Sequence, residues 1–457
     1  GGMAPPSPPR ASVPDTARVL GTILAPAVGQ GPILRRPKVL GLLDRLDADR
    51  RAADLVRHLR ASYSGGPLLL AVPGRPVLLL LTASQVREVL EGAPEPFTPA
   101  SSEKAAALGH FQPHGVLISR GPVRQDRRRF NEAVLDVDRP VHHLGEHVVR
   151  VARDEVGALV STSRFAGGFG WDDWHAMWWR VVRRVVLGDD ARGDTEVTEL
   201  LDTLRGDANW AFLRPRRGGL RERFDQRLRV HLDRRQPGSL ASVLPEVPAG
   251  EDTDPQGQVP HWLFAYDAAA IVSIRALAVL ATYERARERV HEEARSSAED
   301  PTPLLPFLRA CVLESVRLWP TTLAILRETT ADTTVAGCAV PRGATVVIHS
   351  SSFHRDSDTL PYADRFEPEV WLDGRARDEW SLVPFSGGPA RCPGKDLVLM
   401  TTSAVLAALL ERHDVGLAAG RLPEAGRPLP HTLDHTRLRF DLWRRLTPRS
   451  ARGTLDA

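Results

Sequence analysis

The chain has 457 residues, of which 42% are hydrophobic and 26% charged, a balance typical of a water-soluble globular protein. Its net charge of +3 is too small to indicate nucleic acid as a partner, and no apolar run approaches the roughly 18 residues of a membrane span. The three cysteines include no C-x-x-C pair, so a disulfide framework is excluded and a reducing cytoplasm is favoured. Only three of the 60 basic residues are lysine, a bias that indicates a GC-rich genome.

The first part of the chain is predicted to hold little regular structure. Residues 1–35 are rich in proline and are expected to form a flexible leader, in which Gly1 and Gly2 are interpreted as residues left by cloning. Residues 66–81 predict two short strands around a Pro-Gly turn, followed by a helix that Thr82 caps. Residues 93–119 are predicted to be a long loop of the kind that often contributes to binding.

Helical periodicity dominates the middle of the chain, from residue 121 to about residue 300. Within it, Trp171, Trp174 and Trp178 recur at helical spacing and are expected to be core residues. Residues 333–350 alternate around Gly and Pro turns and predict a small antiparallel sheet. Residues 395–414 predict an apolar helix and residues 435–443 a strand. The sum is a mainly α single domain with a minor sheet built from distant segments.

A glycine-rich loop, "FSGGPARCPG" at residues 385–394, presents a single cysteine. Pro393 suits the first turn of a helix, so Cys392 is expected at or next to the N-cap, where free backbone amides and the helix dipole favour a thiolate. The glycines would clear side chains from the path of something flat and bulky, and a thiolate held in this way can supply one axial bond to iron. The alternative is a buried structural cysteine in a turn.

The spacing F-x-x-G-x-x-x-C-x-G resembles the heme-binding loop of the cytochrome P450 heme-thiolate monooxygenases, in particular the soluble bacterial members. The resemblance implies a mainly α cytochrome P450 fold over residues 36–457, a large helical domain with a small β-rich region. It also implies heme b (iron protoporphyrin IX) between the central helix and the cysteine loop, with Cys392 as the iron ligand. The heme contacts that the resemblance assigns in this loop are Pro384, Phe385, Gly388, Arg391 and Gly394. The family's basic residue two positions before the cysteine is Ala390 here, and Arg391 follows it.

An E-x-x-R motif, Glu314 and Arg317, lies 75 residues before the cysteine. Three apart on a helix, the two side chains can pair; alone, the pattern would indicate an exposed ion pair. In the family this pair is often locked by a later arginine, whose position holds Val370 in "FEPEVW". Arg365 or Arg375 is the expected substitute.

Cations are expected where the heme carboxylates would lie. By resemblance, Arg124 and Arg128 in "GPVRQDRRRF" and Arg327 in "ILRETT" would bind the propionates, and arginine–carboxylate bonds are physically apt for this role. The alternative is that they are solvated arginines among the many in the chain.

The segment 261–290 resembles the family's central helix, which carries an acid and an alcohol for proton delivery. One alignment puts Asp267 at the acid and Ala268 at the alcohol, and a shift of one residue gives Ala268 and Ala269. The hydroxyl is absent in both. A substrate hydroxyl with ordered water, peroxide as oxidant, or chemistry without oxygen insertion would each accommodate that absence. Ala265 is assigned to the heme, and the expected substrate contacts are the loop 97–118 and Phe264, Leu323, Ala324 and Ile325.

The resemblance implies a cytoplasmic, monomeric monooxygenase of secondary metabolism that uses O2 to oxidise a small, largely apolar molecule. Electrons would come from a ferredoxin and its ferredoxin reductase, with the ferredoxin docking on Arg127, Arg129 and Lys395. No membrane or nucleic acid is expected as a partner. The alternatives are a heme-thiolate enzyme for peroxide-dependent, coupling or rearrangement chemistry, and a non-catalytic heme-binding partner, against which the intact Cys392 argues.

Overall fold

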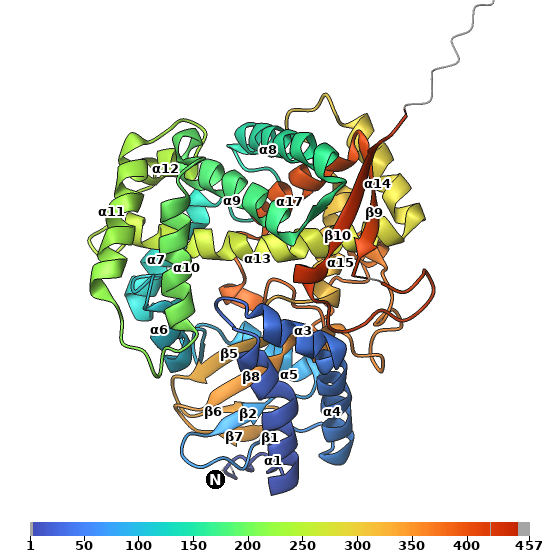
Figure 1. Ribbon diagram of the computed structural model, residues 1–457. Coiled ribbons are helices and arrows are strands. Elements are labelled where there is room, and N and C mark those ends of the chain that lie inside the picture. Colours follow the sequence, from blue (N-terminus) through green and yellow to red (C-terminus); the bar gives the residue numbers. More distant parts are fainter. Residues whose placement is uncertain (1–2, 421, 447–457) are drawn as a thin grey trace, which may run out of the picture.

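The computed structural model describes residues 3–420 and 422–446, and one long helix, α13 (Pro255–Thr282), crosses the middle of the molecule (Figure 1). The other α-helices are α1 (Val13–Val19), α2 (Ala25–Gly29), α3 (Pro37–Arg45), α4 (Ala48–Ser62), α5 (Ala83–Glu91), α6 (Ser102–Leu108), α7 (Gly121–Val134), α8 (Gly145–Ala166), α9 (Trp171–Leu187), α10 (Thr195–Ala208), α11 (Gly218–Arg234), α12 (Leu240–Val243), α14 (Glu284–Ser296), α15 (Pro306–Leu318), α16 (Ser350–His354) and α17 (Lys395–Leu410).

The strands gather at one end of the molecule and along one side (Figure 1). A five-stranded sheet has the order β1-β2-β8-β5-β3, in which only β2 and β8 are parallel neighbours. A three-stranded sheet has the order β4-β10-β9, and β6 pairs with β7 alone. The strands are β1 (Leu68–Leu69), β2 (Val77–Leu79), β3 (Phe97–Thr98), β4 (Phe169–Gly170), β5 (Ala324–Thr329), β6 (Thr333–Val335), β7 (Cys338–Val340), β8 (Thr345–His349), β9 (His413–Ala419) and β10 (Arg439–Arg444).

The predicted mainly α fold with a small sheet from distant segments is therefore confirmed. The strands expected in 66–81 form as β1 and β2, and Thr82 caps α5 through a capping box with Gln85. The expected small sheet at 333–350 is only partly correct. β6 and β7 form it, whereas β8 joins the larger sheet, because its five residues are all buried and need a partner on both edges.

α13 lies in the largest apolar cluster, together with α8, α9, α15 and α17. By length and composition it is the one helix among the described residues that meets the criteria for crossing a membrane, but most of it is buried inside the protein. The expectation of no such apolar run was therefore wrong by that measure, although burial accounts for the apolar character. Trp174 and Trp178 of α9 are fully buried against this core, as the helical spacing predicts, while Trp171 is only partly buried.

The expected flexible leader is wrong, because the N-terminal segment is folded. α1, a short π-helical turn η1 (Leu20–Leu24) and α2 follow one another, and Val19 and Ile23, four residues apart on one face, are buried against α4 and the five-stranded sheet. Ser12 caps α1 and Ala11 donates a hydrogen bond to the Leu69 carbonyl at 2.9 Å. The high proline content of residues 1–35 favoured the prediction of a flexible leader, although Val19 and Ile23 form an apolar stripe. Gly1 and Gly2 lie outside the described residues.

The long loop expected at 93–119 contains short elements of its own: β3, α6 and the turn η2 (Val116–Ile118). Ser101 caps α6 by accepting a hydrogen bond from the Lys104 amide. Phe111 follows α6 and is buried, with its ring 5.6 Å from that of Phe264 on α13. The segment therefore connects the five-stranded sheet to the central helix.

Candidate functional site

The cysteine loop holds Cys392 by backbone hydrogen bonding, with the Cys392 amide donating to the Phe385 carbonyl at 2.9 Å. α17 starts at Lys395 and its N-cap is Gly394, so Cys392 lies two residues before the cap rather than at it. The prediction was displaced because Pro393 and Gly394 complete the turn before the helix begins. Most residues from Pro384 to Gly394 are partly exposed, although the loop lies between buried elements.

The electrostatics of Cys392 combine opposing effects. Burial raises the pKa of the thiol, and the Gly394 backbone amide, Arg128 and Lys395 act in the opposite direction without cancelling the rise. The predicted amide stabilisation is thus present but smaller than the cost of desolvation. A thiolate at this position needs a further positive partner, which an iron ion would supply.

Two glycines of the loop serve different purposes. Gly388 has φ +67°, and a Cβ there would lie 2.2 Å from the Leu90 carbonyl oxygen, so α5 itself requires glycine at this position. At Gly394 a Cβ would meet only Leu135, at 3.8 Å, which is an ordinary contact. No described neighbour therefore requires glycine at 394, and the position is compatible with the approach of a ligand.

The arginines that the sequence assigns to the heme carboxylates come together. Arg124 and Arg327 are 7% and 2% exposed, and each has a buried Nε with no partner among the described residues. Burial lowers the pKa of Arg327, and the nearby charge of Arg124 contributes to the same decrease. Arg128 has a buried, unpartnered Nη2, while its Nε donates to Glu132 at 2.7 Å. Arg327 also reaches the cysteine loop, where its Nη2 donates to Ser386 Oγ at 3.2 Å.

Buried guanidinium nitrogens without partners are costly unless an acceptor fills the site. Three of them converge on the cysteine loop from α7 and β5, so the residues present fit a group that carries carboxylates, as heme b does. Arg391 does not join them, because its Nη2 donates to Asp138 at 2.6 Å on a half-exposed face. The expected contact of Arg391 with the heme is therefore not supported.

One side of α13 is less buried than the rest of the helix. Between residues 258 and 280 the only partly exposed residues are His261, Phe264, Ala265 and Ala268, and we call this set the open face of α13. The spacing of three, one and three residues puts them on one side of the helix. Ala268 is thus on the open face and Ala269, 3% exposed, is not, which favours the alignment with Asp267 and Ala268.

Asp267 belongs to a buried ionic cluster beside the open face, because Arg205, its partner, also lies over the Phe264 ring at 5.1 Å. Its Oδ2 lies 2.8 Å from Arg205 Nη1 of α10, and its Oδ1 lies 2.5 Å from His175 Nε2 of α9. Burial alone would raise the pKa of this carboxyl, but Arg205 and His175 together hold it well below the usual range. Asp267 therefore stays ionised and connects three helices, which differs from the free relay acid that the sequence predicts.

The expected substrate contacts divide between the two faces of β5. Leu323 and Ile325 are 8% and 7% exposed, and Ile325 shares its face with Arg327, because strand residues alternate. Ala324 is on the opposite face and packs against the cluster that holds the N-terminal helices. It is therefore turned away from the arginines, whereas Phe264 lies on the open face of α13.

The E-x-x-R pair is fully buried. Arg317 Nε donates to Glu314 Oε1, and the guanidinium also donates to the carbonyls of His354 at 3.0 Å and Arg365 at 2.7 Å. Glu314 Oε2 accepts from the Glu367 amide at 2.7 Å. Among the described residues no third arginine takes part: the side chain of Arg365 pairs with Glu367, and that of Arg375 with Asp373 and Glu367. Backbone groups of residues 365–367 replace the expected arginine, so Val370 costs the motif nothing.

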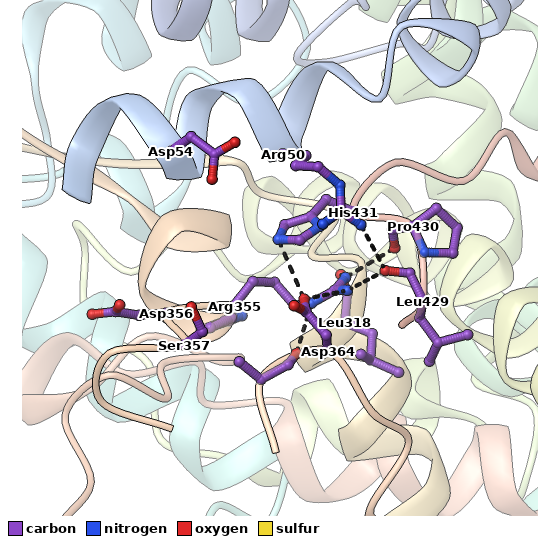
Figure 2. A network of polar contacts seen from close by, with 12 residues as sticks. Arg50, Asp54, Leu318, Arg355, Asp356, Ser357, Asp364, Leu429, Pro430 and His431 are labelled. Carbon is purple, nitrogen blue, oxygen red and sulfur yellow. Dashed lines mark hydrogen bonds and ion pairs between the residues drawn. The ribbon is translucent and has the colours of Figure 1, made fainter. Parts of the chain in front are cut away.

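Sequence reasoning missed a second buried arginine beside this pair, Arg355 at the end of α16 (Figure 2). Its guanidinium donates to the carbonyls of Ala363 at 2.8 Å, Leu318 at 3.1 Å and Leu429 at 2.7 Å. A further bond runs to Asp364 Oδ1 at 3.2 Å. Arg355 thereby ties the end of α15 to two distant loops. Its carbonyl partners carry no sequence signal, so no motif identifies it.

The basic face predicted for docking is only partly present. Arg127 is 9% exposed and donates to the Asp252 carbonyl at 2.9 Å and to Ser119 Oγ at 2.9 Å, so it is an internal residue. Arg129 is half-exposed but pairs with Asp126 at 2.7 Å. Lys395, next to the cysteine loop, is exposed and has no ion-pair partner in the part of the chain that the structure describes.

Comparison with known proteins agrees with this geometry. Residues 260–427 match the family model described as cytochrome P450. A cyclooctat-9-en-7-ol 5-monooxygenase of Streptomyces melanosporofaciens is 31% identical over 142 residues, which are 29% of this chain and 31% of that protein. Ferruginol synthase 1 of Rosmarinus officinalis is 35% identical over 133 residues, 28% and 27% of the two chains. The match spans about a third of the length of the curated relatives.

The fold extends the likeness beyond the matched segment. A zebra fish cytochrome P450 solved with progesterone superposes with a TM-score of 0.68 at 18% identity, over 86% of this chain and 99% of the other. A second structure of a zebra fish cytochrome P450, with abiraterone, gives 0.66 at 18% identity and the same coverage. The solved structures show that the chain has the cytochrome P450 fold, and the matched segment, with the cysteine loop and the buried arginines, makes it similar to the cytochrome P450 superfamily, whose members bind heme b through a cysteine thiolate.

Proposed function

We propose that the chain is a heme-thiolate monooxygenase that uses O2 to oxidise a small, largely apolar substrate of secondary metabolism. The observation that carries the proposal is the convergence of Arg124, Arg128 and Arg327, each with an unpartnered buried nitrogen, on the loop of Cys392. Support comes from the relatives, one of which is named a monooxygenase. The substrates of the relatives are known only for those proteins.

Each residue of the site has a distinct task in this proposal. Heme b supplies the oxidising chemistry when bound, and Cys392 would hold its iron. The three arginines would hold its carboxylates and fix its orientation. Phe264 and Phe111, whose rings are 5.6 Å apart, form an apolar wall beside the open face of α13. Asp267 keeps α9, α10 and α13 together through His175 and Arg205.

Electron delivery by a ferredoxin and its ferredoxin reductase is part of the proposal. Lys395 supports it, because an exposed, unpaired ammonium next to the cysteine loop would attract an acidic partner. Arg129 adds charge only if its pair with Asp126 opens. Arg127 is withdrawn from the docking face because it is buried. A cytoplasmic monomer without membrane or nucleic-acid partners remains the proposed working form.

One observation favours a second candidate, a heme-thiolate enzyme that uses peroxide or catalyses coupling or rearrangement. Ala268 on the open face offers no hydroxyl, and Asp267 is held in an ion-paired cluster. Neither side chain is therefore ready to deliver protons to the space beside the open face. Such chemistry depends less on a protein proton relay than O2 activation does.

Spectroscopy and turnover decide between these functions. The reduced protein with carbon monoxide should show the thiolate-ligated Soret band that gives the family its name, and Cys392→Ala should lose it. Product formation with a ferredoxin and O2 supports the monooxygenase, and product formation only with added peroxide supports the second candidate. A protein that binds heme but gives no product with any ligand that perturbs its Soret band would be a non-catalytic heme-binding partner.

A further inference from the structure

Lys104 is a basic residue that the proposed function does not use. It lies on α6, and its Nζ donates to the Leu326 carbonyl of β5 at 3.3 Å. In the part of the chain that the structure describes, no carboxylate lies within 4 Å of it. The two nearby acids are taken: Glu103 pairs with Arg75 at 3.0 Å, and Glu328 with Arg75 at 2.7 Å and Arg120 at 3.3 Å.

The surroundings of Lys104 are positively charged and partly dry. Burial and then the charge of the neighbouring Arg327 lower the pKa of Lys104 to about 7, against the opposing charge of Glu103. An ammonium in such a place gains from an anion that enters from outside the chain. The site thus favours the binding of a negative charge, which the described residues do not supply.

Counting charges shows that the heme does not supply enough. Arg124, Arg327 and Lys104 have no carboxylate partner among the described residues, whereas Arg128 is paired with Glu132. Heme b carries two propionates, whose charge would balance the two arginines that β5 and α7 bring to the cysteine loop. Lys104 is left without an acid, and an anion that binds there would stabilise its protonated form.

Lys104 also lies close enough to the open face of α13 for its charge to act on His261. Its charge lowers the pKa of His261, which burial lowers first and which stands at about 4, so His261 is neutral at pH 7. Gln112 Nε2 lies 2.9 Å from His261 Nδ1 and, as an amide donor, makes Nδ1 the acceptor. The remaining Nε2–H is then a free donor on the same side of the helix as Phe264.

We propose that Lys104 binds a carboxylate of the substrate, with the His261 Nε2–H as a second donor, so that the substrate is an apolar molecule with one acidic group. The inference rests on the proposed function and names its substrate class. The apolar part would lie along Phe264 and Ala268, and the acid would lie between β5 and α13. A charge-assisted hydrogen bond from an ammonium is strong enough to select an acid over its neutral ester.

The test uses the holoprotein and ligands that report through the iron. Imidazol-1-yl-alkanoic acids of increasing chain length, and their methyl esters, are titrated while the shift of the Soret band is recorded. Because the imidazole binds iron in both series, a difference between acid and ester reports the carboxylate alone. We expect at least one chain length for which the acid binds roughly tenfold more tightly than the ester.

Variants assign that preference to its residue. Lys104→Met should abolish the preference for the acid. If that variant folds poorly, Lys104→Gln, which keeps a hydrogen-bond donor for the Leu326 carbonyl, is used instead and should abolish the preference as well. Lys38→Met, at an exposed lysine of α3, should leave it unchanged. His261→Phe should weaken acid binding without affecting the ester.

Three results would overturn the inference. Equal binding of acid and ester at every chain length would show that the protein has no site for the substrate carboxylate. A preference for the acid that survives Lys104→Met would show that another residue binds the carboxylate. Loss of heme or a shifted reduction potential in Lys104→Met, with the preference kept, would make Lys104 a propionate partner. If the reduced protein lacks the thiolate Soret band, both the proposed function and this inference are refuted. If the band is normal and acid and ester bind equally, only this inference is refuted.

Discussion

Asp267→Asn separates two roles for the buried acid of α13, a structural partner and a proton carrier. The substitution keeps the shape of the side chain but leaves Arg205 and His175 without their carboxylate. Removal of one partner from a buried ion pair costs about 3–5 kcal/mol. We expect about 3 kcal/mol, the lower end of the range, because Asp202 still lies 3.0 Å from Arg205 Nη1.

The assay is unfolding of the holoprotein, followed by circular dichroism and by the Soret band. For a chain of 457 residues a loss of this size should lower the midpoint by roughly 3 °C. Asp202→Asn is the matched control: its carboxyl is 36% exposed, so its removal should cost under about 1 kcal/mol. A double-mutant cycle of Asp267→Asn with Arg205→Met isolates the pair, and we expect a coupling free energy of at least about 1 kcal/mol.

Product formation completes the comparison, at a temperature where all variants are folded. Because the proposed function gives Asp267 a structural task, Asp267→Asn should leave product formation by the folded enzyme close to that of the unchanged protein. Unchanged unfolding and zero coupling, with product formation abolished, would refute the structural role and make Asp267 a proton carrier only. Normal product yield with reduced stability would instead remove it from proton delivery.

Four further predictions follow from named residues. Cys392→Ala should lose the thiolate Soret band of the reduced carbonyl form while the circular dichroism spectrum stays unchanged; a retained band would refute the ligand assignment. Lys395→Glu should slow reduction by a ferredoxin and weaken its salt dependence, whereas Arg127→Glu should destabilise the fold, because only Lys395 is exposed. Ala268→Thr should be tolerated without strong activation; a large gain in product per electron consumed would show a defective relay. Burial and the charge of Arg317 lower the pKa of His354 to about 3 in the folded protein. Below pH 6.5 this histidine is therefore protonated in the unfolded chain but stays neutral in the folded protein. Stability should therefore fall as pH drops from 6.5, by about 2 kcal/mol at pH 5 from this residue, and His354→Gln should reduce that slope in a series of unfolding curves.

The sequence predicts best where chemistry and spacing coincide. Cys392 lies in a recognisable motif, and Arg124 and Arg327 lie in segments that resemble the family's propionate-binding segments. The structure brings the two arginines to the cysteine loop. The helical middle and the strands at 66–81 follow from periodicity alone. Arg391 shows the limit, because its position suits a heme contact but Asp138, 253 residues earlier, takes its guanidinium.

Backbone partners explain most of what the sequence did not reveal. Arg317 and Arg355 satisfy their donors with carbonyls, whose positions depend on how loops close and not on which residues they contain. The folded N-terminal segment is similar, since Ile33 and Leu34 donate their amides to Asn209 Oδ1 of the α10 C-cap. Composition indicates a leader here because none of these contacts needs a particular side chain in the segment.

The open face of α13 connects the missing hydroxyl with the inferred acidic substrate. With Ala268 apolar and Asp267 held by Arg205, His261 is the one titratable residue on that face among those described. Lys104 of α6 acts on His261 from nearby, and Arg205, over the Phe264 ring at 5.1 Å, is already paired with Asp267. If Lys104 binds the substrate carboxylate as inferred, it and His261 are both engaged at the substrate's acidic end. Protons for the proposed reaction then have to come through water ordered by the substrate, because no free acid or alcohol of α13 faces that space. Substrate binding and proton supply would therefore be coupled, and a ligand without the acid should consume electrons without forming product.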